Sequence, residues 1–348
     1  MTNQQSDSEI RTRPCPNCYL CGTKGEYLYH NLSDRLFGAP GKWDLKKCPN
    51  SECGLVWLDP IPMEDDLGKA YINYYTHESV LNSFAYRLRQ RVKRGYAGLG
   101  YGYFASIPLL DCILAIPILF LPFARQQIIA SGLMYLRGEN TGRLLEIGCG
   151  SGFLLAGMRD LGWETEGIDI DPYAVKIARD KLHLKVHLGM LESQNFQNNI
   201  FDAIVMSHVI EHVYDPLAIF TESLRILRPG GKLVVTTPNI ESLGHRRFQT
   251  SWLHLDPPRH LFIFSLRTMK KIAEKSGLSV AVLRSTTRWA DGLWVASENI
   301  RRNNTGKMGG KMNLGMRLRS KLFQITEALS LIKSKTIGEE IVLIAEKR

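Results

Sequence analysis

A glycine-rich turn between two apolar segments is the part of this sequence best suited to chemistry. Residues 144–153 read as an apolar strand carrying Glu146 near its end, followed by Gly148, Gly150 and Gly152 at alternate positions. Glycine lets the main chain turn tightly and lets a ligand approach its N–H groups without a Cβ in the way. The pattern therefore predicts a nucleotide-type pocket at the carboxyl end of a first parallel strand.

The spacing of these glycines argues against a dinucleotide. A dinucleotide-binding turn needs G-x-G-x-x-G, and here Phe153 occupies the last position while Gly152 comes one residue early. The run E-x-G-x-G-x-G resembles instead the first motif of class I S-adenosylmethionine (AdoMet) methyltransferases. Taken alone, the motif leaves an ordinary glycine-rich turn as the alternative.

Three further segments follow in the order that this family shows. Residues 167–172 read as a strand ending in Asp169, whose two carboxylate oxygens can accept hydrogen bonds from a vicinal diol such as a ribose. Residues 201–208 form a continuous apolar run, which is typical of a buried parallel strand. Residues 227–235 read as a helix end, a turn and another buried strand. Over roughly residues 140–290 and the last strand, the chain resembles the class I methyltransferases, closest to the ubiquinone-pathway O-methyltransferases.

The resemblance implies that AdoMet is the methyl donor and binds at the strand ends, with Asp169 on the ribose. The family usually has Gly-Asp after the third strand, whereas Gly189 is followed here by Met-Leu-Glu192. We therefore expect the adenine amino group to meet Glu192 or main chain. The expected AdoMet-binding residues are Glu146, Gly148, Gly150, Gly152, Asp169, Ile170, Leu191, Glu192, Ser207 and His208.

Histidines are the candidates for acid–base chemistry. A base is needed only when the methyl acceptor is a poor nucleophile such as a hydroxyl. His208 and His212 belong to a His-Val-Ile-Glu-His segment after the fourth strand, and its Glu211-His212-Val signature is shared with the ubiquinone branch. H-x-x-E-H also matches a zinc-protease motif, but the segment lies where this fold places AdoMet contacts. Helix capping and loop bracing are the alternative roles for Glu211 and His212.

A second group of candidates lies in residues 252–262, a loop expected over the acceptor side of the pocket. His260 is the predicted general base, and a main-chain hydrogen bond that fixes the loop is its alternative role. Arg259 is expected to pair with an acceptor phosphate or carboxylate, or simply with Asp256. The predicted catalytic residues are His260, His208 and His212.

Four of the seven cysteines have the spacing of a structural zinc site. Cys18 and Cys21 form one pair and Cys48 and Cys53 another, and each pair ends in Cys-Gly, which allows the tight turn of a zinc knuckle. Four thiolates without an open position suit a structural Zn²⁺, which would supply roughly 10–16 kcal/mol to a unit too small for its own core. A pair made by Cys15 with Cys18, or reduced cysteines in small cores, are the alternatives. The segment resembles the zinc-ribbon leader of some methyltransferases.

The basic surplus of the chain is confined to two segments. The formal net charge is +10, but residues 82–110 hold five basic residues and no acid, and residues 288–337 hold ten basic and three acidic residues. Lipid headgroups, phosphorylated substrates and nucleic acid are all compatible with such segments, as is a simple solvated face. The odd number of cysteines argues against a disulfide framework. We expect a cytoplasmic protein, with peripheral contact at the inner face of the membrane as an open alternative.

The apolar segment 107–123 carries a single charge, Asp111, and lies at the short edge for a membrane span. Three interpretations stay open: two short helices that cap the active site, an interfacial or re-entrant anchor assisted by basic residues 87–94, and a full span. Membrane contact through residues 87–123 is thus an expectation.

The alternation of strands and helices predicts an α/β fold: a doubly wound, seven-stranded, Rossmann-like methyltransferase sheet with a small N-terminal zinc ribbon and an apolar helical insertion. We expect O-methylation of a small-molecule, lipid-linked or saccharide intermediate. The alternative is a zinc-ribbon nucleic-acid methyltransferase, although the Asn/Asp-Pro-Pro-Tyr/Phe motif of base methylation is absent after the fourth strand. The expected divisions are a disordered tail (1–14), a zinc ribbon (15–62), the helical insertion (63–137) and the methyltransferase domain (138–348) with a basic insertion (288–337).

Overall fold

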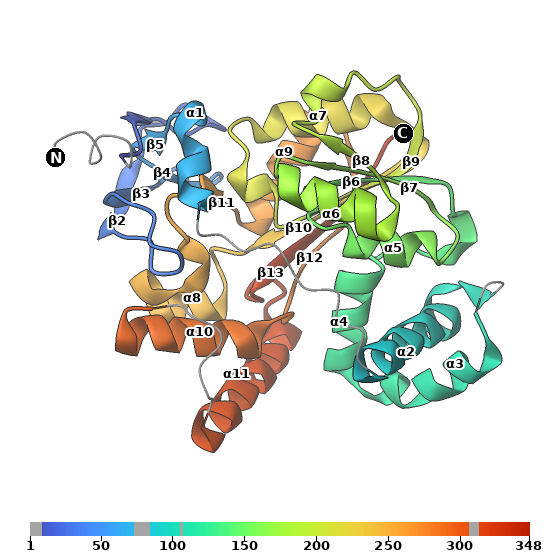
Figure 1. Cartoon of the computed structure of the whole chain (residues 1–348). Helices are drawn as coiled ribbons and strands as arrows, with labels where there is room; N and C mark the ends of the chain where they lie inside the picture. The colour runs from blue at the N-terminus through green and yellow to red at the C-terminus, as the bar shows by residue number, and fades with distance from the viewer. Residues whose placement is uncertain (1–8, 73–83, 105–106, 306–312) are drawn as a thin grey trace, which may run out of the picture.

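A seven-stranded sheet forms the centre of the protein. The computed structural model describes residues 9–72, 84–104, 107–305 and 313–348 (Figure 1). The strands of the central sheet are β6 (Arg143–Ile147), β7 (Glu164–Asp169), β8 (Lys185–Leu188), β9 (Phe201–Ser207), β10 (Leu227–Pro238), β12 (Ser279–Thr286) and β13 (Glu340–Glu346). Their order is β12-β13-β10-β9-β6-β7-β8. β13 runs antiparallel to both of its neighbours, while β10, β9, β6, β7 and β8 pair in parallel, which confirms the predicted fold class.

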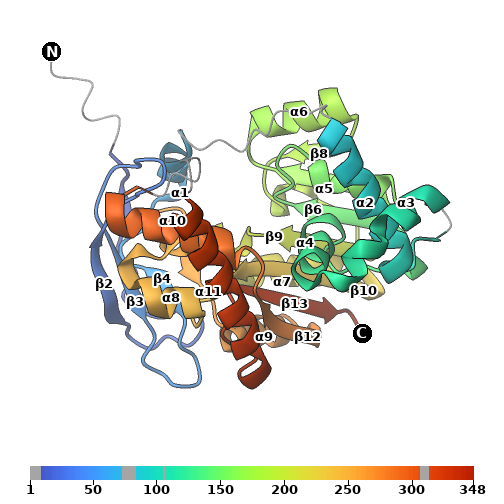
Figure 2. The same cartoon turned by 90° about the horizontal axis from the view of Figure 1, so that it is seen from below.

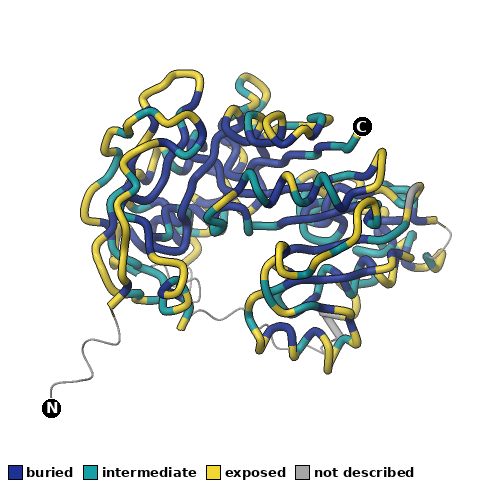
Figure 3. Tube along the Cα trace, turned by 90° about the horizontal axis from the view of Figure 1, so that it is seen from above, coloured by how far each residue is buried: buried dark blue, intermediate teal, exposed yellow. Residues whose placement is uncertain are grey.

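Helices cover both faces of this sheet, which explains why its strands read as continuous apolar runs. Successive side chains of a strand point to opposite faces, so that Leu145 and Ile204 pack into one core while Leu144 and Val205 pack into the other. Figure 3 shows the sheet as the most deeply buried part of the molecule. The covering helices are α4 (Pro122–Gly132), α5 (Phe153–Arg159) and α6 (Pro172–Leu182) on one side and α7 (Pro216–Ile226) and α9 (Leu266–Lys275) on the other (Figure 1).

The N-terminal unit shares a sheet with a distant part of the chain. Its antiparallel strands are β2 (Glu26–Leu32), β3 (Trp43–Lys47) and β4 (Val56–Leu58). The fourth strand is β11 (Phe262–Ile263), in which Phe262 pairs with Trp57. Because β11 belongs to the loop after β10, this loop is fixed to the cysteine-bearing unit.

The prediction of a disordered tail over residues 1–14 is wrong for residues 9–14, which are ordered. Residues 1–8 lie outside the described part of the chain. β1 (Thr12–Arg13) pairs with β5 (Ile61–Pro62). Arg11 explains this order, because its main-chain N and its Nε donate to Asp66 Oδ2 at 2.9 and 2.7 Å. The side chain of Ile10 is buried.

The apolar insertion is divided into several helices, of which α2 is the longest, rather than forming one continuous helix. Its elements are α1 (Glu64–Leu67), η1 (Gly68–Tyr71), α2 (Phe84–Tyr101), α3 (Leu109–Ala115), η3 (Ile116–Phe120) and α4. Pro117 and Pro122 stand in the first turns of η3 and α4, where proline is tolerated but a continuing helix is not. Within the residues that the structure describes, no helix is long and apolar enough to cross a membrane.

The basic insertion consists of two helices between β12 and β13. They are α10 (Ala290–Asn303) and α11 (Leu314–Lys333), which pack against each other. Figure 1 shows α11 and the α2–α3–α4 group below the central sheet, and Figure 2, seen from that side, shows α11 next to α10 with the α2–α3–α4 group separate from it on the right. The remaining elements are α8 (Leu243–Phe248), η4 (Gly138–Asn140), η5 (Glu192–Gln194), η6 (Ile210–His212), η7 (Gln249–Ser251) and η8 (Leu253–Leu255).

Candidate functional site

The glycine turn after β6 exposes its main chain at one position and packs tightly at another. Gly148 and Gly150 have φ values of 71° and 52°, in the left-handed region that favours glycine. A Cβ on Gly148 would lie 2.4 Å from Cγ2 of Val209, whereas a Cβ on Gly150 would meet nothing within 4 Å. The turn is therefore packed tightly at Gly148 and open at Gly150, where a ligand has room to approach the main chain.

Two carboxylates stand at the ends of neighbouring parallel strands beside this turn. Asp169 ends β7 and accepts hydrogen bonds from the main-chain N of Gly150 at 2.6 Å and of Asp171 at 2.9 Å. Glu146, on β6, is buried, and its Oε2 has no hydrogen-bond partner among the described residues. Burial and then the charge of Asp169 raise the pKa of Glu146 well above its usual value. This site therefore suits a ligand that brings hydrogen-bond donors or positive charge.

The predicted adenine contacts lie on the far side of Asp169. Ile170 is exposed directly after β7, and Glu192 is exposed in η5. The side chain of Leu191 is instead buried in the core, so that only its main chain is available to a ligand. Met190, which was not predicted, is exposed beside it. Its exposure could not be read from the sequence, in which Met190 is marked only by its place after Gly189.

The strand order places this turn where open α/β sheets bind ligands. The chain passes from β6 to β7 and β8 on one side, then returns to β9 on the other side of β6. Such a reversal leaves a crevice at the carboxyl ends of the two central strands. Glu146, the glycine turn and Ser207, which ends β9, all belong to these ends.

Comparison with known proteins agrees with this arrangement. Residues 123–282 match a protein family described as "Methyltransferase domain". This chain contains a class I, AdoMet-dependent methyltransferase domain. The match covers the strands from β6 to β10, together with almost all of α4 and the first half of β12.

The matches with individual relatives span only part of this chain and less than half of each curated relative. The chain is 38% identical over 105 residues to the ubiquinone biosynthesis O-methyltransferase of Xanthomonas oryzae, which is 28% of this chain and 43% of that relative. It is 29% identical over 159 residues to the biotin biosynthesis bifunctional protein BioHC of Teredinibacter turnerae, covering 41% and 28%. A solved AdoMet-dependent methyltransferase of Thermotoga maritima, a possible histamine N-methyltransferase, gives a TM-score of 0.44 at 19% identity and covers 66% of this chain and 92% of that one.

Four histidines of the methyltransferase domain form a cluster beside the ends of β9 and β10. The ring centroids of His208 and His254 are 5.8 Å apart, those of His254 and His260 are 6.2 Å apart, and those of His260 and His212 are 4.8 Å apart. The structure thus brings the three predicted catalytic histidines together, and His254, which was not predicted, lies between them.

His208 is held as a cation. Its Nε2 lies 3.0 Å from Oε1 of Glu340, and its Nδ1 lies 3.3 Å from Oε1 of Glu211. Burial acts to lower the pKa of His208, but its contacts with the two carboxylates outweigh burial and raise the pKa to about 9. Arg288 also pairs with Glu340 at 2.8 Å. A protonated His208 cannot accept a proton at neutral pH, although it can orient or attract a ligand.

His212 and His260 are anchored to main-chain carbonyls. His212 Nδ1 lies 2.9 Å from the carbonyl oxygen of Arg259, and His260 Nδ1 lies 2.8 Å from that of His254. Burial and the charge of His260 lower the pKa of His212 to about 4. Donation from Nδ1 leaves Nε2 as the atom of each ring that can accept a proton or a metal. For His260, the hydrogen bond matches the loop-fixing role that the sequence left open. Its Nε2 lies 3.9 Å from Oδ2 of Asp256, too far for a hydrogen bond.

One carboxylate lies within reach of these two rings. Glu211, His212 and His260 each offer one atom, and these atoms lie within 4.8 Å of one another. Two imidazoles and a carboxylate are a donor set that suits a divalent cation. The set is not that of the protease motif, because His260 from the loop after β10 takes the place of His208.

Arg259 is committed to the protein and is not available to an acceptor. Its guanidinium is fully buried and pairs with Asp34 at 2.7 Å and with Asp256. Its Nη1 also donates to the carbonyl of Ala70. Of the two sequence interpretations, pairing with Asp256 is the one observed, and Asp34 of the N-terminal unit is the partner that the sequence did not reveal.

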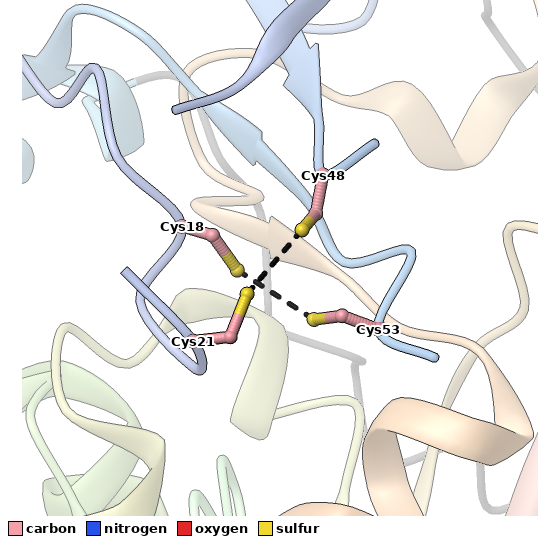
Figure 4. A group of neighbouring side chains, drawn as sticks. All are labelled: Cys18, Cys21, Cys48 and Cys53. Atoms are coloured by element: carbon pink, nitrogen blue, oxygen red, sulfur yellow. Dashed lines mark hydrogen bonds between the residues drawn. The ribbon is translucent and has the colours of Figure 1, made fainter. Parts of the chain in front are cut away.

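The four predicted cysteines converge on one point (Figure 4). Sγ of Cys18 lies 3.6 Å from that of Cys53, and Sγ of Cys21 lies 3.4 Å from that of Cys48. All four sulfurs lie within 4.8 Å of one another. Thiolates at the corners of a tetrahedron around Zn²⁺, with Zn–S bonds of about 2.3 Å, are about 3.8 Å apart. The donor set therefore fits a closed zinc site, and Cys15 is not part of the group.

Proposed function

We propose that this protein transfers the methyl group of AdoMet to an oxygen of a small-molecule, lipid-linked or saccharide acceptor. One observation carries the proposal: the buried Glu146, one of whose carboxylate oxygens has no hydrogen-bond partner in the described part of the chain, stands next to Asp169 beside an open glycine turn. Two adjacent acids with unused acceptor capacity match a ligand that carries an amino group, a sulfonium and two ribose hydroxyls. The match to a methyltransferase family supports the same ligand.

The chain's own residues would hold AdoMet from two sides. Asp169 would accept the ribose hydroxyls, since each of its oxygens can accept more than the one main-chain hydrogen bond it has now. Ile170 and Met190 would cover the adenine with their exposed apolar side chains. AdoMet supplies a methyl group already activated by the sulfonium, so that alignment with the acceptor, worth roughly 7–11 kcal/mol, is the main task of the protein.

The histidine cluster supports an oxygen acceptor. A hydroxyl is a poor nucleophile until it loses its proton, and a neutral imidazole is suited to take that proton. His260 is our candidate base, because its Nε2 is the ring nitrogen left over after the loop-fixing hydrogen bond. His212, whose pKa is lowered to about 4, is neutral at physiological pH and is the second candidate. His208, as a cation, would attract or orient an electron-rich acceptor.

Zinc belongs to the same proposal as a structural element. The four thiols fit a closed tetrahedral site with no position left for a substrate. Bound zinc would stiffen the knuckles that precede β2 and β4, and β4 in turn pairs with β11 in the histidine-bearing loop. The zinc site would thus support the acceptor side of the pocket without entering the chemistry.

Methyl transfer from labelled AdoMet tests the proposal. Purified protein would be given AdoMet with a tritiated methyl group and, separately, a lipid extract, a polar metabolite extract, total RNA and DNA. We expect label in the lipid or metabolite pool, in a product whose mass-spectrometric fragments place the methyl group on oxygen. Label confined to RNA or DNA would overturn the proposal in favour of a nucleic-acid methyltransferase.

A further inference from the structure

Helix α11 buries polar residues and exposes apolar ones. Its buried side chains are Ser320, Phe323, Gln324 and Glu327. Its other face carries large apolar side chains at steps of three and four residues, each between 46% and 82% exposed; they are Leu314, Leu318, Leu322, Ile325, Leu329 and Ile332. A helix on a water-facing surface normally shows the opposite arrangement. The apolar face of α11 is therefore built to be covered.

The insertion shows the same inversion independently. Asp111, the one acid between residues 84 and 132, is buried and pairs with Arg91 at 2.6 Å and Arg94 at 3.1 Å. The large apolar side chains around it are exposed instead, and Leu109, at 76%, and Phe120, at 79%, are the most exposed of them. The others are Leu110, Ile113, Ile116, Leu119 and Leu121. Here too, charge is turned inward and apolar surface outward.

The two apolar surfaces lie at one end of the molecule and flank a groove. Figure 1 shows α11 and the α3–α4 segment both below the central sheet. Between them is a cavity of about 360 Å³ with a mixed polar and apolar lining: Phe123, Arg125, Gln126 and Ile129 of α4, Ala328 and Leu331 of α11, and residues 284–287 at the end of β12. Thr286 Oγ1 donates to Glu340, the carboxylate that also holds His208. Through Thr286, the wall of the groove is therefore connected to the carboxylate that pairs with His208.

Positive charge accompanies both surfaces. Residues 84–132 hold six basic residues against the buried Asp111, and residues 314–333 hold four against the buried Glu327. Arg87, Arg89, Arg125, Arg317 and Arg319 are exposed. Association with a second copy through this face would bring two cationic surfaces together, whereas an anionic bilayer is complementary to it.

We propose that α11 and the α3–α4 segment together form a docking surface for an anionic phospholipid bilayer. The apolar side chains enter the boundary between headgroups and acyl chains, and the surrounding arginines and lysines bind the headgroups. This arrangement requires no helix that crosses the membrane. The groove between the two surfaces then admits the apolar chain of a membrane-resident acceptor, a part of the proposal that rests on the proposed function.

Flotation with vesicles tests the docking surface. The full-length protein would be mixed with vesicles of phosphatidylcholine, with and without phosphatidylglycerol. The variants would be Leu322→Gln/Leu329→Gln on α11 and Leu110→Gln/Ile113→Gln on α3, with Tyr27→Gln/Ile72→Gln as a control that alters exposed apolar side chains elsewhere. We expect the wild type and the control to float with phosphatidylglycerol vesicles, and each surface variant to partition at least tenfold less.

Two results would overturn the docking surface: wild-type protein that stays unbound with both lipids, or surface variants that float as the wild type does. A stable dimer that sedimentation shows to be lost in the α11 variant, without vesicle binding, would overturn it in favour of a second copy. AdoMet binding by the same samples keeps the outcomes separate. Vesicle binding without any AdoMet binding would contradict the proposed function and leave the docking surface standing.

The groove has its own variant. Ala328→Trp would fill the cavity between α4 and α11. We expect normal AdoMet binding and normal flotation, with transfer of label into the lipid extract reduced at least tenfold. Unchanged transfer into that extract would overturn the groove as the entry for the acceptor.

Discussion

The buried guanidinium of Arg259 pairs with Asp34, so that the N-terminal unit and the histidine-bearing loop share one ion pair. Nη1 of Arg259 lies 2.7 Å from Oδ2 of Asp34, and Nη2 lies 2.9 Å from Oδ1, in a bidentate arrangement. Both side chains are completely excluded from solvent. Because β4 and β11 pair alongside, the cysteine unit acts as part of the pocket's framework.

Loss of this pair should destabilise the protein strongly. We predict that Asp34→Asn lowers the free energy of unfolding by about 3–5 kcal/mol, because it leaves a buried guanidinium without its full counter-charge. Asp44→Asn, at a partly exposed pair with His30, serves as the control and should cost about 1 kcal/mol or less. Denaturant unfolding measures both. An Asp34→Asn protein as stable as the control would contradict a structural role for the pair.

The pair also implies a pH dependence. Burial acts to raise the pKa of Asp34, but the hydrogen bonds from Arg259 and from the main-chain N–H groups of Phe37 and Ala39, together with the charge of Arg259, outweigh burial, so that the pKa lies below its ordinary value of 3.8. A carboxylate whose pKa is lowered by folding stabilises the protein above the ordinary value, and this stabilisation is lost as the pH falls through the lowered value. The difference between the wild type and Asp34→Asn should therefore shrink only in strong acid.

Zinc should be found in the purified protein at about one ion per chain. Cys48→Ser should lose it, and Cys112→Ser, outside the thiol cluster, should retain it. We expect chelation to unfold the N-terminal unit while AdoMet binding largely survives, because Glu146 and Asp169 lie on other elements. Methyl transfer should fall, since β11 loses its partner strand. Elemental analysis decides the first point, and absence of metal in protein purified without chelator would count against the site.

His260→Ala should lower kcat by about 10²–10⁴-fold, the usual range for general base catalysis, with little change in AdoMet affinity. His30→Ala, at an exposed histidine, should leave kcat unchanged. His208→Ala should weaken both AdoMet binding and turnover, because His208 lies at the end of β9. Single-turnover methyl transfer separates these effects. A near-normal kcat in His260→Ala would contradict His260 as the base. It would indicate that His212 is the base, or that the nucleophile needs no base.

Glu327 should make the protein less stable at alkaline pH. Burial, and then the charge of Glu339, raise the pKa of Glu327 far above its ordinary value of 4.5. A carboxyl group whose pKa is raised by folding costs stability as the pH rises above its ordinary value. We predict that Glu327→Gln is more stable than the wild type at pH 9 by about 1 kcal/mol or more, whereas Glu346→Gln, at a partly exposed pair, is not. Equal pH dependence of wild type and Glu327→Gln would contradict this.

Local sequence patterns were sufficient to predict most of the fold and part of the candidate site. The glycine turn and Asp169 were predictable because buried parallel strands read as apolar runs and their ends are marked by glycine and acid. The four cysteines were predictable because a knuckle is a local turn. Asp34 and Glu340 were not, since each meets its partner, Arg259 or His208, only through tertiary structure.

The inverted helices were hidden for a different reason. The hydrophobic periodicity of α11 is the same whether its apolar face points inward or outward. Only the packing of Gln324 and Glu327 against the body of the protein shows which face is exposed. The two-residue strand β11 was likewise too short to be marked by any pattern.

Calorimetric titration of AdoMet tests the central claim most directly. Wild-type protein should bind about one AdoMet per chain, and Asp169→Asn should bind at least about 30-fold more weakly, since about 2 kcal/mol is lost when a ribose hydroxyl loses its charged acceptor. Asp171→Asn is the matched control, because Asp171 caps α6 and asparagine caps equally well; its affinity should be unchanged. Equal affinities of the wild type and Asp169→Asn, or no binding by the wild type, would contradict the account.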